Sequence, residues 1–301
     1  MRIRIISLAL AAAALAAPAW ANPVNVFACE PEWAALTTEI GGDKVVVYSA
    51  TTGAQDPHQV QARPSLIAKA RSANLAVCTG AELEIAWLPM LAQQSGNNNI
   101  KAGGTGLFEA TTAVHLLEAP ARLDRADGDV HAGGNPHIQT DPRMMIPVSR
   151  ALAQKLAAID PANAATYTSR QADFEKRWTA ALAGWTTKAA PLKGVSIAVQ
   201  HHSWTYLENW LGLIEVTPLE PKPGVPPSSG YLAQVLQKMQ TKPVKMVVRA
   251  AYEDDRPSAF IAERAKIPAV TLPFTVGGTD QAKDLFSLYD DTINRLLAGL
   301  K

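Results

Sequence analysis

Three histidines and one aspartate of this sequence lie in segments rich in turn-forming residues. They are His58 in TTGAQDPHQV, His137 in GGNPHIQTDP, His201 directly after GVSIAVQ, and Asp280 in TVGGTDQAKD. A lone histidine is usually a loop or core residue. Three imidazoles and one carboxylate together, however, suit a first-row divalent cation, and zinc above all. Calcium or magnesium would require mostly oxygen ligands.

Prolines restrict the backbone next to two of these histidines. Pro57 and Pro136 each immediately precede a candidate ligand and fix the φ angle there. The residues before them, Asp56 and Asn135, are expected to be extended. A site that is formed before the metal arrives loses less conformational entropy on binding. The turn residues therefore favour a preorganised metal site.

The elements that must position these side chains alternate between strand and helix. Up to about residue 145, predicted strands VNVFA, KVVVYSA and NLAVC alternate with helices EPEWAALTTEIGG, 65–70 and AELEIAWLPMLAQQSG. After Pro191 the strands GVSIAVQ, VKMVVRA and PAVTLPF alternate with helices SWTYLENWLG, 231–239, SAFIAERAK and 284–300. This alternation is typical of parallel sheets packed between helices. At least three of the four candidates follow the carboxyl ends of predicted strands, where such sheets bind ligands.

The stretch between the two halves is helical in pattern. Pro147 to Lys188 is almost free of strand signals, and apolar residues recur along 162–188 at three- and four-residue steps. A helix of that length would measure about 40 Å. We therefore predict an α/β protein with an N-terminal lobe at 22–145, a linking helical segment at 146–190 and a C-terminal lobe at 191–301. A long rigid helix joins the lobes, and the metal cleft lies between them.

The first 21 residues have the pattern of a secretion signal. Arg2 and Arg4 precede an apolar run, and Ala19-Trp20-Ala21 forms a small-residue cleavage site. The alternative is a membrane anchor, although the apolar run is short for a bilayer. Removing this segment leaves 26 basic and 27 acidic residues, a net charge of −1. That balance gives no electrostatic reason to bind nucleic acid or an anionic membrane.

The only two cysteines, Cys29 and Cys78, each end an apolar run. In an exported protein an even pair can form a disulfide, and two neighbouring strands would bring the sulfurs together. The alternative is a pair of buried thiols. A zinc-thiolate site is not expected, because the CxxC spacing is absent.

These motifs, taken together, resemble a known family. The chain resembles the zinc-binding receptors of ABC importers in four motifs. These are DPH at 56–58, GNPH with a trailing DP at 134–142, the histidine five residues before Tyr206, and the aspartate of GGTD. The family is that of the periplasmic, ZnuA-like receptors of cluster A-I, and the lack of a long His-rich loop is typical of their AztC type. The resemblance covers essentially the whole chain after residue 21.

The resemblance implies a function and a set of ligands. The family's metal ligands fall on His58, His137, His201 and Asp280, with His202 a neighbouring competitor for the third place. The implied protein is no enzyme but a monomeric periplasmic receptor that binds Zn²⁺ and delivers it to a permease in the inner membrane. A periplasmic zinc metallochaperone is a possible donor. Manganese-selective relatives carry glutamate at the third position, so an imidazole there favours zinc.

The loop before His137 departs from many zinc-receptor relatives, which carry a long stretch rich in His, Asp and Glu. Here the stretch holds only His115 and His131. His131 is either a metal-capture residue or a solvated loop histidine. His115 has no predicted role in metal binding.

Three other functions stay open. One is a manganese or iron receptor of the same family. Another is a zinc-dependent hydrolase with Asp280 as base, which would need an exchangeable water on zinc; neither HExxH nor GxSxG is present. The third is an adhesin-like surface protein that uses the same fold without transport.

Overall fold

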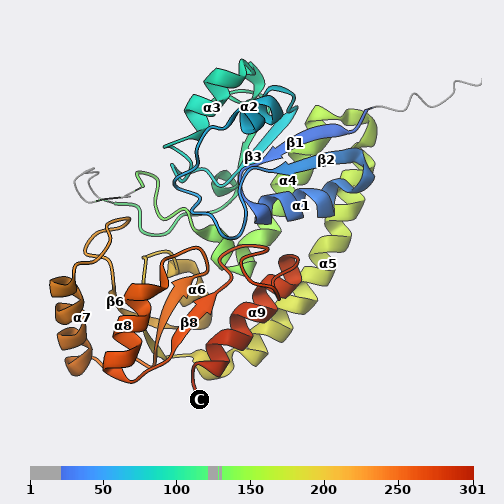
Figure 1. The fold of residues 1–301 in the computed structure, drawn as a ribbon. Coiled ribbons are helices and arrows are strands. Elements are labelled where there is room, and N and C mark those ends of the chain that lie inside the picture. The colour runs from blue at the N-terminus through green and yellow to red at the C-terminus, as the bar shows by residue number, and fades with distance from the viewer. Residues whose placement is uncertain (1–21, 121–127, 129–130) are drawn as a thin grey trace, which may run out of the picture.

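The computed structural model of this chain describes residues 22–120, 128 and 131–301. The predicted export segment, residues 1–21, lies outside the described residues. Two α/β lobes lie one above the other in Figure 1, and the long helix α5 runs along the side of both. Within the described ranges, the helices are too short or too polar to cross a membrane.

The N-terminal lobe is built on a four-stranded parallel sheet in the order β2-β1-β3-β4. Its strands are β1 (Val24–Ala28), β2 (Val45–Ser49), β3 (Leu75–Cys78) and β4 (Leu107–Glu109). Its helices are α1 (Pro31–Gly41), α2 (Pro64–Arg71) and α3 (Leu88–Ser95). Parallel strands require crossover connections, which α1, α2 and α3 with their flanking loops supply.

The C-terminal lobe repeats this topology in the order β6-β5-β7-β8, again entirely parallel. Its strands are β5 (Ser196–Val199), β6 (Ile214–Pro218), β7 (Met246–Ala250) and β8 (Ala269–Leu272). Its helices are α6 (Thr205–Leu211), α7 (Ser229–Thr241), α8 (Asp255–Ala265) and α9 (Leu285–Ala298). The predicted architecture of two parallel-sheet lobes flanked by helices is confirmed.

Two strands and one helix boundary differ from the sequence-based prediction. Strands β4 and β6 were not predicted; both lie at sheet edges, where one side needs no partner and the alternation of apolar residues is weak. The helix predicted from Ala81 begins only at Leu88, because Ala81 and Glu82 adopt left-handed backbone angles, φ +50° and +68°. Such angles cannot continue a right-handed helix.

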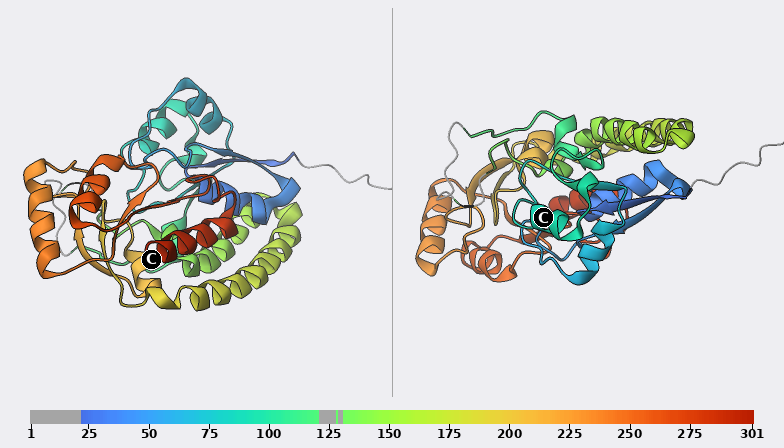
Figure 2. Two further views of the ribbon diagram at one scale, coloured as in Figure 1. Left: turned by 60° about the horizontal axis from the view of Figure 1, so that its bottom comes forward. Right: turned by 90° about the horizontal axis from the view of Figure 1, so that it is seen from above.

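Two helices form the connection between the lobes. Helix α4 (Met145–Ile159) leads through a short 3₁₀ turn at Pro161–Asn163 into α5 (Ala164–Lys188). The 25 residues of α5 give a length of about 38 Å at about 1.5 Å per residue. Figure 2 shows α5 as a long, gently curved helix that extends alongside both lobes.

The apolar face of α5 belongs to a core that both lobes share. Trp178 is fully buried, with its ring centroid 5.1 Å from that of Phe174 and 4.9 Å from that of Phe286 in α9. The same cluster continues into the sheets through residues such as Val26 and Val248. Because close-packed interiors resist deformation, this shared core opposes large rotation of one lobe against the other.

A disulfide joins Cys29, directly after β1, to Cys78 at the end of β3. The two strands are neighbours in the sheet, and the two Cα atoms lie 4.8 Å apart. The predicted bridge is therefore present, and it ties together the carboxyl ends of these two neighbouring strands.

Candidate metal centre

Three histidine side chains converge where the lobes meet. His58, His137 and His201 each offer a ring nitrogen, and these three atoms lie within 4.8 Å of one another. The ring centroids are 5.4 Å apart for His58 and His137, 5.6 Å for His58 and His201, and 5.7 Å for His137 and His201. All three residues are buried, with 2–7% of their surface exposed. Both lobes contribute, since His58 follows β2 and His201 follows β5.

A repeated Asx-Pro-His turn fixes two of the rings. The Oδ1 atom of Asp56 accepts hydrogen bonds from the backbone N–H of His58 at 2.9 Å and from its Nδ1 at 2.8 Å. Asn135 Oδ1 accepts the equivalent two bonds from His137, at 3.0 and 2.7 Å. The side chain before the proline thus reaches over it to orient the histidine ring, a local turn that Asp and Asn form readily.

The third ring is oriented by a residue distant in sequence. Nδ1 of His201 lies 2.7 Å from Oε2 of Glu220, in the loop after β6, and the same oxygen accepts the N–H of Gly224 at 2.9 Å. Each Nδ1 thus faces a side-chain oxygen that accepts hydrogen bonds and cannot donate them. Each imidazole therefore carries its proton on Nδ1 and its lone pair on Nε2. In the described part of the chain, Nε2 of His58 and of His137 is buried without a hydrogen-bond partner. This is the arrangement expected of metal ligands with outer-shell acceptors.

Burial keeps the central imidazole uncharged. Desolvation, followed by the neighbouring imidazoles of His58 and His201, lowers the pKa of His137 well below its usual range. A neutral imidazole is the form that binds a metal ion. Its ring also lies against Phe274, at a centroid distance of 5.7 Å.

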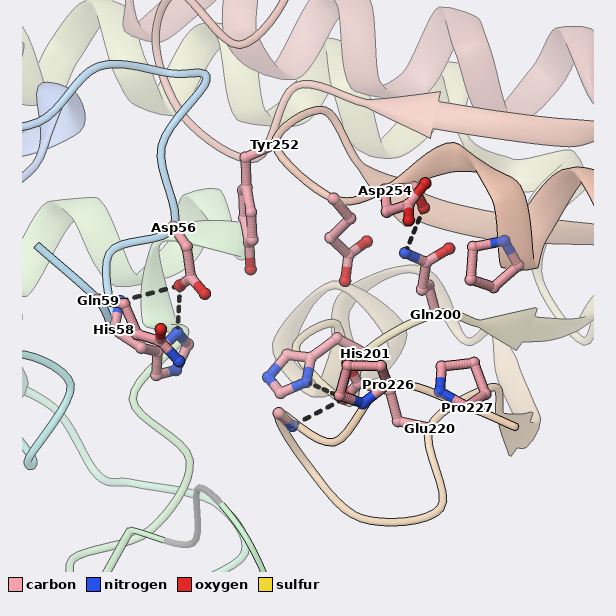
Figure 3. Close-up of a pocket in the computed structure, with 13 residues that line it drawn as sticks. Asp56, His58, Gln59, Gln200, His201, Glu220, Pro226, Pro227, Tyr252 and Asp254 are labelled. Carbon is pink, nitrogen blue, oxygen red and sulfur yellow. Dashed lines mark hydrogen bonds and ion pairs between the residues drawn. The ribbon is translucent and has the colours of Figure 1, made fainter. Parts of the chain in front are cut away.

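An acidic cavity of about 260 Å³ opens beside this cluster. Figure 3 shows Asp56 and His58 on one side of it and His201 with Glu220 across from them. Glu253 also lines the cavity, and burial raises the pKa of its carboxyl to about 8. Glu253 is therefore mostly uncharged near pH 7, and the carboxylates that favour cations at the opening are those of Asp56, Glu220 and Asp254.

The two remaining sequence candidates lie outside the group of three. The ring of His131 is 5.6 Å from that of His58 and 6.1 Å from that of His137. Asp280 is exposed. Among the described residues, its carboxylate oxygens are not part of the group of ligand atoms that lie within 4.8 Å of one another. Its loop nevertheless abuts the His58 loop: a Cβ on Gly53 would lie 2.3 Å from the backbone nitrogen of Gly278.

His202 is not part of the group of three imidazoles, although it follows His201 directly in sequence. Its Nδ1 lies 2.8 Å from Glu215 and its Nε2 lies 3.0 Å from Glu118. Both ring nitrogens are thus engaged by carboxylates. Of the two adjacent histidines, the structure brings His201 to the cluster.

The sequence interpretation missed the three acceptors that orient these rings. The prolines predict an extended backbone at Asp56 and Asn135 but give no role to their side chains. The repetition of Asx-Pro-His at 56–58 and 135–137 is the sequence signal for that role. Glu220 carried no such signal, because it follows β6, a strand that was not predicted.

Most of the chain matches one known protein family. The family described as "Zinc-uptake complex component A periplasmic" (ZnuA) matches residues 26–299. The manganese ABC transporter substrate-binding lipoprotein PsaA of Streptococcus pneumoniae is 23% identical over 276 residues, 88% of this chain and 85% of that protein.

Solved structures share the fold. A crystal structure of ZnuA superposes with a TM-score of 0.75 at 22% identity, covering 91% of this chain and 99% of that one. The laminin-binding adhesin Lmb of Streptococcus agalactiae, in a mutant form, superposes with a TM-score of 0.74 at 21% identity, covering 92% and 100%.

Two lobes sharing one core, with buried imidazoles between them, define a metal-binding receptor of the kind that serves ABC transporters, and such receptors work with a membrane permease. The chain belongs to the ZnuA family. It is a metal-binding substrate-binding protein of an ABC transporter.

Proposed function

We propose that the metal carried by this receptor is Zn²⁺, bound by His58, His137 and His201. The observation that supports this most directly is that each of the three rings has its Nδ1 tied to an oxygen, with Nε2 left to bind an ion. Zinc accepts three nitrogen ligands in a tetrahedral arrangement, whereas manganese prefers more carboxylate and water oxygens. Relatives such as PsaA are named for manganese, so selectivity is the first property to test.

A competition titration of the metal-free protein against a chromophoric chelator tests this choice. Zn²⁺, Mn²⁺ and Fe²⁺ should each be titrated at pH 7.5 in the absence of oxygen. We expect zinc to bind at least 100-fold more tightly than manganese, as the order of divalent-metal affinities for nitrogen ligands indicates. Tighter binding of manganese would overturn the proposal in favour of a manganese receptor.

We propose that Asp280 supplies the fourth ligand and that His131 contacts the ion on its way in. The first part rests on the family resemblance and on the close packing of the Gly277-Gly278 segment against the His58 loop. Coordination by Asp280 then requires a local shift of its loop. The second part is supported by the position of the His131 ring beside His58 and His137.

Alanine variants separate these roles. Replacing His58, His137 or His201 should weaken zinc binding by more than 100-fold, and His115→Ala is the matched control, since His115 is exposed. Asp280→Ala should raise the zinc Kd, whereas His131→Ala should slow zinc transfer from a chelator and leave the Kd nearly unchanged. If Asp280→Ala binds zinc as tightly as the original protein and His131→Ala does not, the fourth ligand is His131.

We propose that zinc is released by local loop movement, with the lobes 22–145 and 191–301 held by the 146–190 segment. The shared core around Trp178 supports this. Metal-free and zinc-loaded protein should give nearly the same radius of gyration in X-ray scattering. A large rigid-body rotation between the two states would refute the idea.

We propose that the chain is exported by cleavage after residue 21 and works as a periplasmic monomer. It delivers zinc to an inner-membrane permease and can be loaded by a metallochaperone. N-terminal sequencing and size-exclusion chromatography of protein from the periplasm test cleavage and monomeric state. Zinc-dependent growth of a deletion strain separates transport from adhesion, and a water ligand on bound zinc would support the hydrolase instead.

A further inference from the structure

The histidine that lies beside the third proposed ligand has a defined position of its own. Nδ1 of His202 faces Glu215 Oε2 at 2.8 Å, and its Nε2 faces the two Glu118 oxygens at 3.0 and 3.1 Å. Both ring nitrogens of His202 are thus within hydrogen-bond distance of carboxylates. This engagement keeps His202 from competing with His201.

Glu118 makes further contacts with the loop that leads to His137. Its Oε2 accepts hydrogen bonds from Asn135 Nδ2 and from Thr205 Oγ1, each at 3.0 Å. Next to it, the N–H of Leu117 donates to the hydroxyl oxygen of Tyr206 at 3.0 Å, and that hydroxyl donates to Asn135 O at 2.7 Å. Glu118 itself has a left-handed backbone, φ +56°, which a non-glycine residue adopts only where its surroundings hold it. Side chain and backbone together fix its carboxylate.

The amide nitrogen of Asn135 donates to Glu118 at 3.0 Å, its shortest contact, and lies 3.4 Å from His202 O and 3.3 Å from Thr205 Oγ1. Because the amide nitrogen donates to Glu118, the amide oxygen must face the other way, towards His137. There it accepts from the His137 N–H at 3.0 Å and from Nδ1 at 2.7 Å. If the Asn135 amide were rotated by 180°, its NH₂ group would face two donors of His137, the backbone N–H and the Nδ1–H. The orientation of Asn135 therefore fixes Nδ1 as the protonated nitrogen of His137.

We propose that Glu118 is a positioning residue for metal binding. It holds the Asn135 amide so that His137 presents Nε2 to the ion, and it engages His202 so that only His201 of the adjacent pair is available as a ligand. It acts through Asn135 and His202, to which its carboxylate is hydrogen-bonded. This inference rests on the proposed metal site, but its effect on His137 exists in the metal-free protein.

Glu118→Gly is the variant that tests this role, because glycine accepts φ +56° without strain and lacks the carboxylate together with its two methylene groups. Lys266→Gly is the matched control: Lys266 is exposed and has the same φ of +56°. Glu118→Gln is the conservative variant, since its amide oxygen can still accept from Asn135. Zinc affinity is measured by chelator competition, and ¹⁵N-histidine NMR of the metal-free protein at pH 8 reports which nitrogen of His137 carries the proton.

We expect Glu118→Gly to raise the zinc Kd about tenfold, the lower end for loss of an outer-shell partner, and to populate the Nε2–H form of His137. Glu118→Gln should recover most of the affinity, and Lys266→Gly should match the original protein. A Glu118→Gly variant with Kd within twofold and an unchanged His137 tautomer would overturn the proposal.

The original protein supplies a second test that needs no variant to fold. Its His137 must carry the proton on Nδ1, and a dominant Nε2–H form would also overturn the role of Glu118. The two proposals can fail separately. If the original protein binds zinc weakly, zinc is not the cargo. If its His137 nevertheless shows the Nδ1–H form and Glu118→Gly loses that form, the positioning role of Glu118 stands.

Discussion

Replacing Asp56 with alanine should weaken zinc binding about tenfold while leaving the fold intact. Asp56 Oδ1 accepts from both the backbone N–H and Nδ1 of His58, and its own side chain is partly exposed, at 41%. Without this acceptor, the ring has roughly two flip states and two tautomers, of which about one in four presents a lone pair on Nε2 to the ion. That alone raises the apparent Kd about fourfold.

The carboxylate also makes the imidazole a stronger base, so its loss weakens the bond to zinc directly. Outer-shell partners of this kind contribute about 10- to 100-fold in metal affinity. We expect the lower end, about 1.4 kcal/mol, because Pro57 still restricts the backbone beside His58. The assay is chelator competition at pH 7.5, with circular dichroism as the test of folding.

Asp56→Asn is the matched control. Asn135 holds His137 through an amide oxygen in the same geometry, so asparagine at 56 should keep the Kd within about threefold. A folded Asp56→Ala variant that binds zinc within twofold of the original protein would refute the reasoning. An asparagine variant as weak as the alanine variant would show that charge, and not ring orientation, is what Asp56 provides.

Three further predictions concern stability. The metal-free protein should lose stability as the pH falls below about 6.5, because burial lowers the pKa of His137 and the unfolded chain then binds more protons. Urea unfolding measures the free energy of unfolding against pH, and its slope should be smaller in His137→Gln. An equal slope in the two proteins would contradict the prediction. Replacing Cys29 and Cys78 by serine should lower the free energy of unfolding by about 4 kcal/mol, as the chain-entropy relation gives for a separation of 49 residues. Guanidinium unfolding measures this change, and a loss below about 1 kcal/mol would count against the relation here. Trp178→Ala should lower the free energy of unfolding by about 3–5 kcal/mol, since the ring is fully buried among aromatic side chains. The zinc Kd of the folded protein should not change. A higher Kd would mean that the core of α5 also shapes the site.

The prediction of the fold succeeded where the sequence pattern was strong. Central strands such as Leu75–Cys78 are continuous apolar runs, and the stripe through Trp178 marks α5 clearly. It failed at β4 and β6, edge strands of mixed polarity, which are formed by pairing with β3 and β5 and not by a strong pattern of their own. It also extended α3 too far, because periodicity does not reveal the left-handed angle at Ala81.

For the site, the sequence by itself determined which residues could serve: three histidines that follow strands or prolines, and an aspartate in a glycine-rich loop. Their local turns are encoded within a few residues, as Asp56 and His58 illustrate. Only the tertiary structure decided that His201 and not His202 faces the cluster, because that choice depends on Glu220 and Glu118, carboxylates from distant loops. Short-range contacts can be read along the chain, whereas contacts across the lobes exist only once both sheets have folded against the shared core.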